Sequence, residues 1–158
     1  DRIEEFRKKL NDNATLSEED FVERIHIDIA LPTAYLSEDL IREFDMLEPY
    51  GTDNKKPLFA QKSLCICGVR ELGATGRALK LFLKDDRGYP VEAIYFGDIA
   101  AFYQAVVDAA GEQELLRMRQ GQKHHVGITC TYYPEINEWN GCRNIQIIIK
   151  NYRITSLE

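Results

Sequence analysis

The sequence of 158 residues lacks several patterns that define common classes of protein. It holds no run of roughly 18–20 apolar residues, the length that a membrane-spanning helix needs, and no signal-peptide pattern opens it. It also lacks a glycine-rich phosphate loop of the P-loop kind, and no spacing pairs a nucleophile with a base. The sequence therefore predicts neither contact with a membrane nor an active site within these residues.

Patterns of metal ligands are also scarce. A zinc site would need paired C-x2-C spacing or additional histidines, whereas the four cysteines stand at Cys65, Cys67, Cys130 and Cys142. His124 and His125 are adjacent, so in a strand they would face opposite ways and could rarely bind one ion. We expect no metal or cofactor here, reduced cysteines that act as small apolar residues, and a cytoplasmic location.

Positive charge is in short supply, because the formal net charge is −6. Residues 1–59 carry 8 Lys/Arg against 15 Asp/Glu, whereas residues 60–158 carry 12 against 11. Attraction of the whole molecule to nucleic acid is therefore not expected, and any site for a polyanion must be a local patch in the second part.

The first third of the chain predicts a mixture of helix and strand that ends in a turn-rich connector at 48–57. Ile25, Ile27 and Ile29 alternate with polar or small residues, which indicates a half-buried strand. Ser37 is a helix N-cap, followed by apolar residues at helical spacing. The expected elements are a helix over 1–11, a short helix from Ser17, a strand over 24–31 and a helix over 37–47.

From Pro57 onward the pattern is mainly that of strands. The expected strands lie at 58–71, 76–84, 91–96, 125–138 and 142–154, and a turn over 73–77 joins the first two. A helix begins at an Asp98 cap and ends at Gly111, a helical turn follows at 112–119, and Asn140-Gly141 is typical of a type I′ hairpin. This order predicts a mainly β fold: a five-stranded OB-fold barrel with one helix between strands 3 and 4, preceded by an α+β connector.

The second expected strand has one apolar and one mixed face. Leu79, Leu81 and Leu83 point one way, while Lys80, Phe82 and Lys84 point the other. A ring between two lysines suits single-stranded nucleic acid, since cations meet phosphates and the ring stacks on a base. Alternatively, Phe82 packs under a loop or under the N-terminal segment, and the residues alone leave both interpretations open.

The hairpin repeats this arrangement and carries Trp139, the only tryptophan of the chain. Trp139 and Arg143 flank the turn, and Tyr132 and Tyr133 precede it. In the last strand, Ile145, Ile147 and Ile149 are expected to face inward and Asn144, Gln146 and Lys150 outward. Trp139 is either an exposed ring that stacks on bases or a lid that folds back over the barrel mouth.

Two longer stretches, LEPYGTDNKKPLFA (47–60) and YYPEINEWNGCRNIQIIIKNYRI (132–154), resemble the RecJ family. RecJ proteins are bacterial single-stranded-DNA-specific exonucleases of the DHH phosphoesterase superfamily. The family's hairpin pattern falls on Tyr132, Asn137, Trp139 and Gly141. One departure is Asp53-Asn54-Lys55, where Gly-Asn-Pro is more usual in the family.

The resemblance implies a C-terminal fragment of such an enzyme, with residues 1–56 as the tail of the DHH-associated domain plus a connecting helix, and 57–158 as the OB domain. The parent would hydrolyse single-stranded DNA from the 5′ end, in repair and recombination, with Mn²⁺ or Mg²⁺ held in its DHH domain. The fragment itself would be inactive. Expected partners are single-stranded DNA, the enzyme's own catalytic core, single-strand-binding protein and a helicase.

We therefore predict a DNA-binding set of ten residues. They are Arg77, Lys80, Phe82, Lys84, Tyr95, Tyr132, Asn137, Trp139, Arg143 and Lys150. The alternative function is a protein-interaction module that docks single-strand-binding protein or a helicase.

Overall fold

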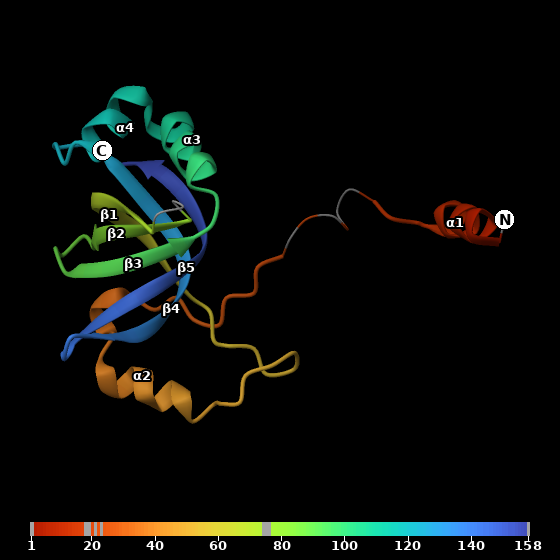
Figure 1. Cartoon of the computed structure of the whole chain (residues 1–158), viewed down its shortest axis with the longest axis horizontal. Coiled ribbons are helices and arrows are strands. Elements are labelled where there is room, and N and C mark those ends of the chain that lie inside the picture. The colour runs from red at the N-terminus through yellow and green to blue at the C-terminus, as the bar shows by residue number, and fades with distance from the viewer. Residues whose placement is uncertain (1, 18–19, 21, 23, 74–76, 158) are drawn as a thin grey trace.

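The computed structural model describes residues 2–17, 20, 22, 24–73 and 77–157 (Figure 1). Its helices are α1 (Arg2–Asn13), the 3-10 helix η2 (Thr33–Tyr35), α2 (Glu38–Asp45), α3 (Ile99–Ala110) and α4 (Glu112–Arg119). Its strands are β1 (Phe59–Leu72), β2 (Ala78–Lys84), β3 (Pro90–Phe96), β4 (Val126–Trp139) and β5 (Cys142–Ser156).

The five strands close into a barrel in the order β1-β2-β3-β5-β4, and β4 also pairs with β1. The β3–β5 pair is parallel and the other pairs are antiparallel. This confirms the predicted OB fold, with α3 between β3 and β4 and the helical turn at 112–119 formed as α4. Figure 1 shows α3 and α4 at one end of the barrel and α2 at the other.

The core fills the barrel with the apolar rows of its strands. Leu79, Leu81 and Leu83 are at most 1% exposed, as predicted, and Ile147 and Ile149 are buried beside them. Ile145 is only half-buried, since β3 pairs with β5 from Gln146 to Ile149 and not beyond. Side chains from the helices complete the core: Phe102, Val106 and Met118.

Local signals set the ends of several elements. The side chain of Ser37 accepts a hydrogen bond from Leu40 N, and that of Asp98 accepts one from Ala101 N, so both predicted caps are confirmed. The Asn140-Gly141 turn is also confirmed, with φ values of 50° and 76° at its two residues. Both values lie in the left-handed region that a type I′ turn requires.

The strand predicted over 24–31 is wrong. Only Ile29 forms an isolated bridge, with Phe59, and Ile25, Ile27 and Ile29 are all exposed. An alternating pattern forms a strand only where a neighbouring strand takes up its backbone hydrogen bonds. Here the Asp28 amide bonds to Leu58 O and the Ile29 carbonyl to Ala60 N, which leaves most of the segment unpaired with the barrel.

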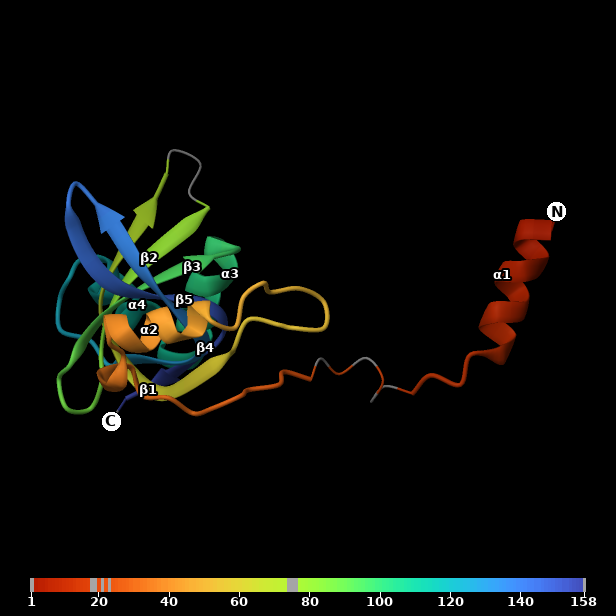
Figure 2. The ribbon, with the colours of Figure 1, turned by 90° about the horizontal axis from the view of Figure 1, so that it is seen from below.

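The rest of the N-terminal third divides into two parts. The α2 helix packs on the barrel, where the Phe44 and Phe59 ring centroids lie 5.2 Å apart. In contrast, α1 lies apart from the barrel in Figures 1 and 2, and none of its residues is buried. The short helix predicted from Ser17 and the turn over 73–77 fall partly on residues outside the described ranges.

Candidate nucleic-acid interface

The strand register defines one continuous surface, here called the outer face, on the side of β2, β3, β5 and β4 that points away from the core. One row across it runs Arg70, Lys80, Ile94, Ile148, Tyr133. The next row runs Gly68, Phe82, Glu92, Gln146, Glu135. Asn137 and Trp139 continue this face along β4, since alternate residues of a strand share a side.

Phe82 combines the two roles that the sequence left open. Its ring lies over Gly68 of β1, where an added Cβ would come within 3.5 Å of the Phe82 Cδ2 atom. The side chain nevertheless remains 39% exposed. Phe82 therefore packs on the backbone of the neighbouring strand and still presents part of its ring to solvent.

The charges around Phe82 are mixed. Lys80 Nζ lies 2.8 Å from a Glu92 carboxylate oxygen and 5.6 Å from the centroid of the Phe82 ring. Glu135 stands in the same row, so two carboxylates share this part of the outer face. Lys84 is exposed. Because Glu92 neutralises Lys80, that lysine attracts phosphates less than its sequence position suggested.

A second cluster of cations surrounds Tyr133. The Lys56 ammonium lies 4.2 Å from the centroid of the Tyr133 ring, and the Lys150 ammonium lies 4.9 Å from it. Lys150 follows Ile148 on the outer side by alternation. It stands at a bulge, because Asn151 pairs with Thr131 and Ile149 with Tyr132, which leaves Lys150 as the extra residue. Partial burial, and then Glu135, raise the pKa of Tyr133.

Sequence reasoning did not select Tyr133 or Lys56. A signal for Tyr133 was available, because residues 133, 135, 137 and 139 share one side of an alternating strand. Lys56 has no such signal, since only the fold brings the connector beside β4.

Trp139 lies at the tip of the hairpin and is 73% exposed, so its ring is open to solvent and does not cover the barrel mouth. Asn137 is half-buried on the same side. The β1–β4 register ends at Tyr132 and the β3–β5 register ends at Gln146, so the hairpin projects beyond the closed barrel.

The structure places two of the predicted aromatic residues on the interior side of the barrel, which corrects the prediction that they face DNA. Tyr132 is fully buried, and its hydroxyl donates to the Leu31 carbonyl oxygen at 2.6 Å. Tyr95 is paired with Leu79, on the interior side, and its ring packs against Phe102 and Tyr152. Neither ring is placed to stack on a base, because Tyr132 lies in the core and alternation puts Tyr95 on the interior side.

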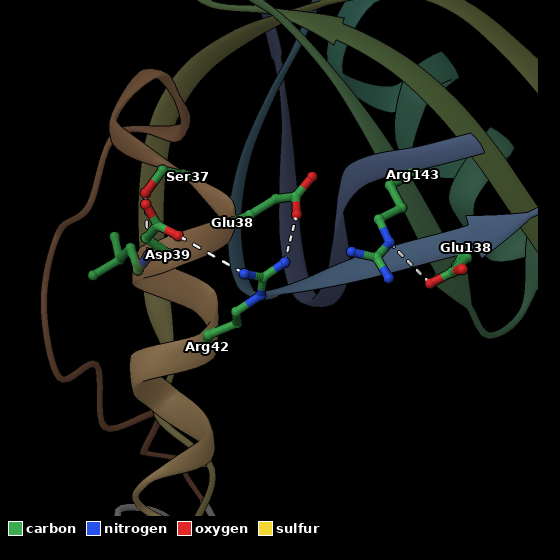
Figure 3. A network of polar contacts seen from close by, with 7 residues as sticks. Ser37, Glu38, Asp39, Arg42, Glu138 and Arg143 are labelled. Atoms are coloured by element: carbon green, nitrogen blue, oxygen red, sulfur yellow. Dashed lines mark hydrogen bonds and ion pairs between the residues drawn. The ribbon is translucent and has the colours of Figure 1, made fainter. Parts of the chain in front are cut away.

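The predicted position of Arg143 beside Trp139 on the DNA-binding face is also corrected. It lies opposite Glu138 in the register and forms an ion pair with it at 3.0 Å, as Figure 3 shows. By alternation it shares the side of Ile145 and Ile147, not that of Trp139. Figure 3 also shows Arg42 paired within α2, with Glu38 at 3.0 Å.

Arg77 belongs to the predicted DNA-binding set, and Gln146 is its predicted neighbour on the outward side of the last strand. Arg77 is exposed just before β2 begins. Gln146, expected to face outward, is on the outer face but buried, and its side-chain amide donates to Glu135.

Among the described residues, the histidines and cysteines form no metal-binding group. His124 Nδ1 accepts a hydrogen bond from Val126 N at 3.2 Å. Within the described residues, no group of three or more His, Cys, Asp or Glu side chains is placed to hold a metal ion. The four cysteines are free thiols. No helix in the described ranges is long and apolar enough to cross a membrane.

Comparison with known proteins assigns the family. The profile of the RecJ OB domain matches residues 27–151, which is most of the chain. The chain belongs to the RecJ OB domain family. The resemblance read from the sequence motifs is thereby confirmed.

Known RecJ proteins are much longer than this chain. The single-stranded-DNA-specific exonuclease RecJ of Bacillus subtilis is 24% identical over 155 residues, which cover 97% of this chain but only 17% of that protein. The crystal structure of Thermus thermophilus RecJ with Mg²⁺ matches with a TM-score of 0.55 at 24% identity, over 84% of this chain and 17% of that one. The Mn²⁺ complex of the same protein matches with the same TM-score. These two structures support the fold.

Proposed function

We propose that this RecJ OB domain binds single-stranded DNA along its outer face, as part of a RecJ-like 5′→3′ exonuclease of cytoplasmic DNA repair and recombination. The observation that carries the proposal is the exposed Trp139 on the same side as the Tyr133 ring, which two lysines flank. Aromatic rings that stack on bases, with cations nearby for the phosphates, are the usual means of binding single strands.

The charge pattern indicates how single-stranded DNA would lie on the outer face. The hairpin tip offers a ring and amide side chains, and the two lysines at Tyr133 offer charge about half-way along β4. Lys84 and Arg77 add exposed cations on the β2 side. We therefore propose that the single-stranded DNA runs from the hairpin tip across β5 toward β2.

Trp139 provides a direct test, because no other tryptophan contributes to the fluorescence. Oligo-dT should quench or shift its emission. Trp139→Ala should weaken binding by about 1–3 kcal/mol, the usual worth of one base–aromatic stack. The melting temperature should not change, since the ring is 73% exposed.

The matched control is Tyr35→Ala, which removes an exposed ring from η2, outside the outer face. Its affinity for oligo-dT should equal that of the parent chain. If Trp139→Ala also leaves affinity unchanged, stacking at the tip is wrong. The protein-interaction function, with single-strand-binding protein or a helicase as partner, would then become the leading hypothesis.

Catalysis is proposed to reside in the rest of the full-length enzyme. The T. thermophilus structures contain Mg²⁺ or Mn²⁺, but the described residues here offer no group of ligands that fits such an ion. We expect the purified chain to leave labelled single-stranded DNA intact with either metal present. Metal-dependent digestion that survives purification and is lost in the His124→Ala, His125→Ala double variant would refute this.

A further inference from the structure

A cavity of about 220 Å³ lies between the connector and β4. Its apolar walls come from α2 and from the β4 strand, including Ile41, Phe44 and Ile136. Tyr133 and Glu135 line it and also belong to the outer face, so the cavity and the outer face are continuous at these two residues.

Lys56 lies at this cavity, between two aromatic rings. Its ammonium is 4.2 Å from the Tyr133 centroid and 5.7 Å from the Tyr50 centroid. The Tyr50 hydroxyl donates to the Phe44 carbonyl oxygen at 2.6 Å, which fixes that ring against α2. A cation near a ring face occupies the place that a flat, stacked ligand would take.

The loop before Lys56 is held in place by its own side chains. The Asn54 amide donates to the Leu47 carbonyl oxygen at 2.6 Å and to the Pro49 carbonyl oxygen at 3.1 Å. The Gly51 amide bonds to the Asn54 carbonyl oxygen at 2.8 Å. These hydrogen bonds fix the loop that leads to Lys56 at the cavity wall.

The charges of the cavity indicate what it can hold. Two carboxylates, Asp45 and Glu135, line it together with the single ammonium of Lys56. A phosphate inside would be repelled by both carboxylates, whereas an amino group on a flat ring would find acceptors there. Lys56 and Lys150 are then left to meet the phosphates outside. Drug-sized ligands occupy pockets of about 300–1,000 Å³, so the occupant is smaller.

We propose that this cavity binds one nucleobase of the single strand, with a preference for bases that carry an exocyclic amino group. The base stacks on Tyr133, the Lys56 ammonium moves from the ring to a neighbouring phosphate, and Asp45 or Glu135 accepts from the amino group. This inference rests on the proposed function, because it requires a single strand on the outer face.

The experiment compares oligo-dC with oligo-dT on the whole chain, by anisotropy of labelled oligonucleotides over a range of salt. The parent chain should bind oligo-dC more tightly, because thymine offers no amino group. Tyr133→Leu keeps an apolar side chain but removes the ring, and should lower affinity for oligo-dC about 5- to 150-fold. It should also abolish the preference while leaving the salt dependence unchanged.

Lys56→Met should have the opposite combination of effects to Tyr133→Leu. It keeps the apolar stem of the side chain, so the preference for oligo-dC should remain, while the log–log salt slope flattens by about 0.7 for one lost phosphate contact. Tyr89→Leu, which removes an exposed ring that does not line the cavity, is the control and should match the parent chain. Circular dichroism melts establish that each variant is folded.

The outcomes separate the two proposals. If the parent chain binds DNA and Trp139→Ala weakens it, but Tyr133→Leu keeps the affinity and preference of the parent, the cavity inference is wrong and the proposed function stands. Equal binding of oligo-dC and oligo-dT by the parent chain also overturns the cavity inference. If the parent chain binds neither oligonucleotide, both proposals fail. Should Tyr133→Leu not fold, an abasic site placed within oligo-dC provides the test: unchanged affinity at every position contradicts a bound base.

Discussion

Two segments of this chain carry the same alternating pattern and end in opposite environments. Leu79, Leu81 and Leu83 are at most 1% exposed, whereas Ile25, Ile27 and Ile29 are between 42% and 59% exposed. The leucines lie on β2, which has β1 and β3 on its two sides. The isoleucines lie on a segment with a single isolated bridge. Alternation therefore determines which residues share a face, while neighbouring strands determine whether that face is buried.

The first prediction tests this comparison by replacing one of the leucines and one of the isoleucines with alanine. Leu81→Ala should lower the free energy of unfolding by about 2–5 kcal/mol, the usual range for a buried leucine. Ile27→Ala should change it by less than about 0.5 kcal/mol, because the side chain is already exposed. Chemical denaturation of both variants gives the two values.

A loss below about 0.5 kcal/mol for Leu81→Ala would mean that the faces of β2 are assigned the wrong way round. A loss above about 1 kcal/mol for Ile27→Ala would show instead that the N-terminal segment packs on the barrel in solution.

The second prediction compares the turn of the β4–β5 hairpin with a turn in the connector. Gly141 has φ of 76°, and a side chain there would be strained. Gly141→Ala should therefore cost about 1–2 kcal/mol of stability. Gly51 lies in the connector with nothing within 4 Å of an added Cβ and with no positive φ, so Gly51→Ala should be close to neutral. Equal losses in thermal melts would contradict the type I′ geometry of the hairpin.

Much of the fold could be predicted because its signals are local. The Ser37 and Asp98 caps and the Asn140-Gly141 turn each depend on neighbours in the sequence, and their order along the chain is that of an OB barrel. The candidate site was less predictable, because packing between distant segments decides part of it. Alternation already predicted that Lys150 faces outward, whereas only the fold brings Lys56 beside Tyr133.

The errors in the predicted site have the same origin. Tyr132 belongs to the family motif but lies in the core of this chain, where its hydroxyl donates to the Leu31 carbonyl oxygen. Arg143 follows the turn closely, but its alternation with Ile145 places it on the side opposite Trp139. Position near a functional motif thus did not determine the face on which a side chain lies.

The third prediction separates the two sides of the hairpin by their salt dependence. Lys150→Ala should flatten the log–log salt slope of oligo-dT binding by about 0.7, the loss of one phosphate contact on a single strand. Arg143→Ala should leave the slope unchanged, because Arg143 is paired with Glu138 on the other side. Lys80→Ala should have an intermediate effect, since Glu92 already neutralises that lysine. A larger change for Arg143→Ala than for Lys150→Ala would reverse our assignment of the DNA-binding face.

The smallest expected effect concerns His124, which lies at the barrel end just before β4. Burial lowers the pKa of His124 below its ordinary value of 6.5, and its neutral ring accepts a hydrogen bond from Val126 N. The unfolded chain therefore takes up a proton more readily than the folded chain. The stabilising contribution is complete above the unfolded pKa, and it is lost as the pH falls from there through the lowered pKa of the folded chain.

Melting temperatures measured from about pH 8 to about pH 5.5 should consequently fall less in His124→Gln than in the parent chain. If the His124→Gln curve runs parallel to that of the unsubstituted chain, the proton uptake belongs to other groups.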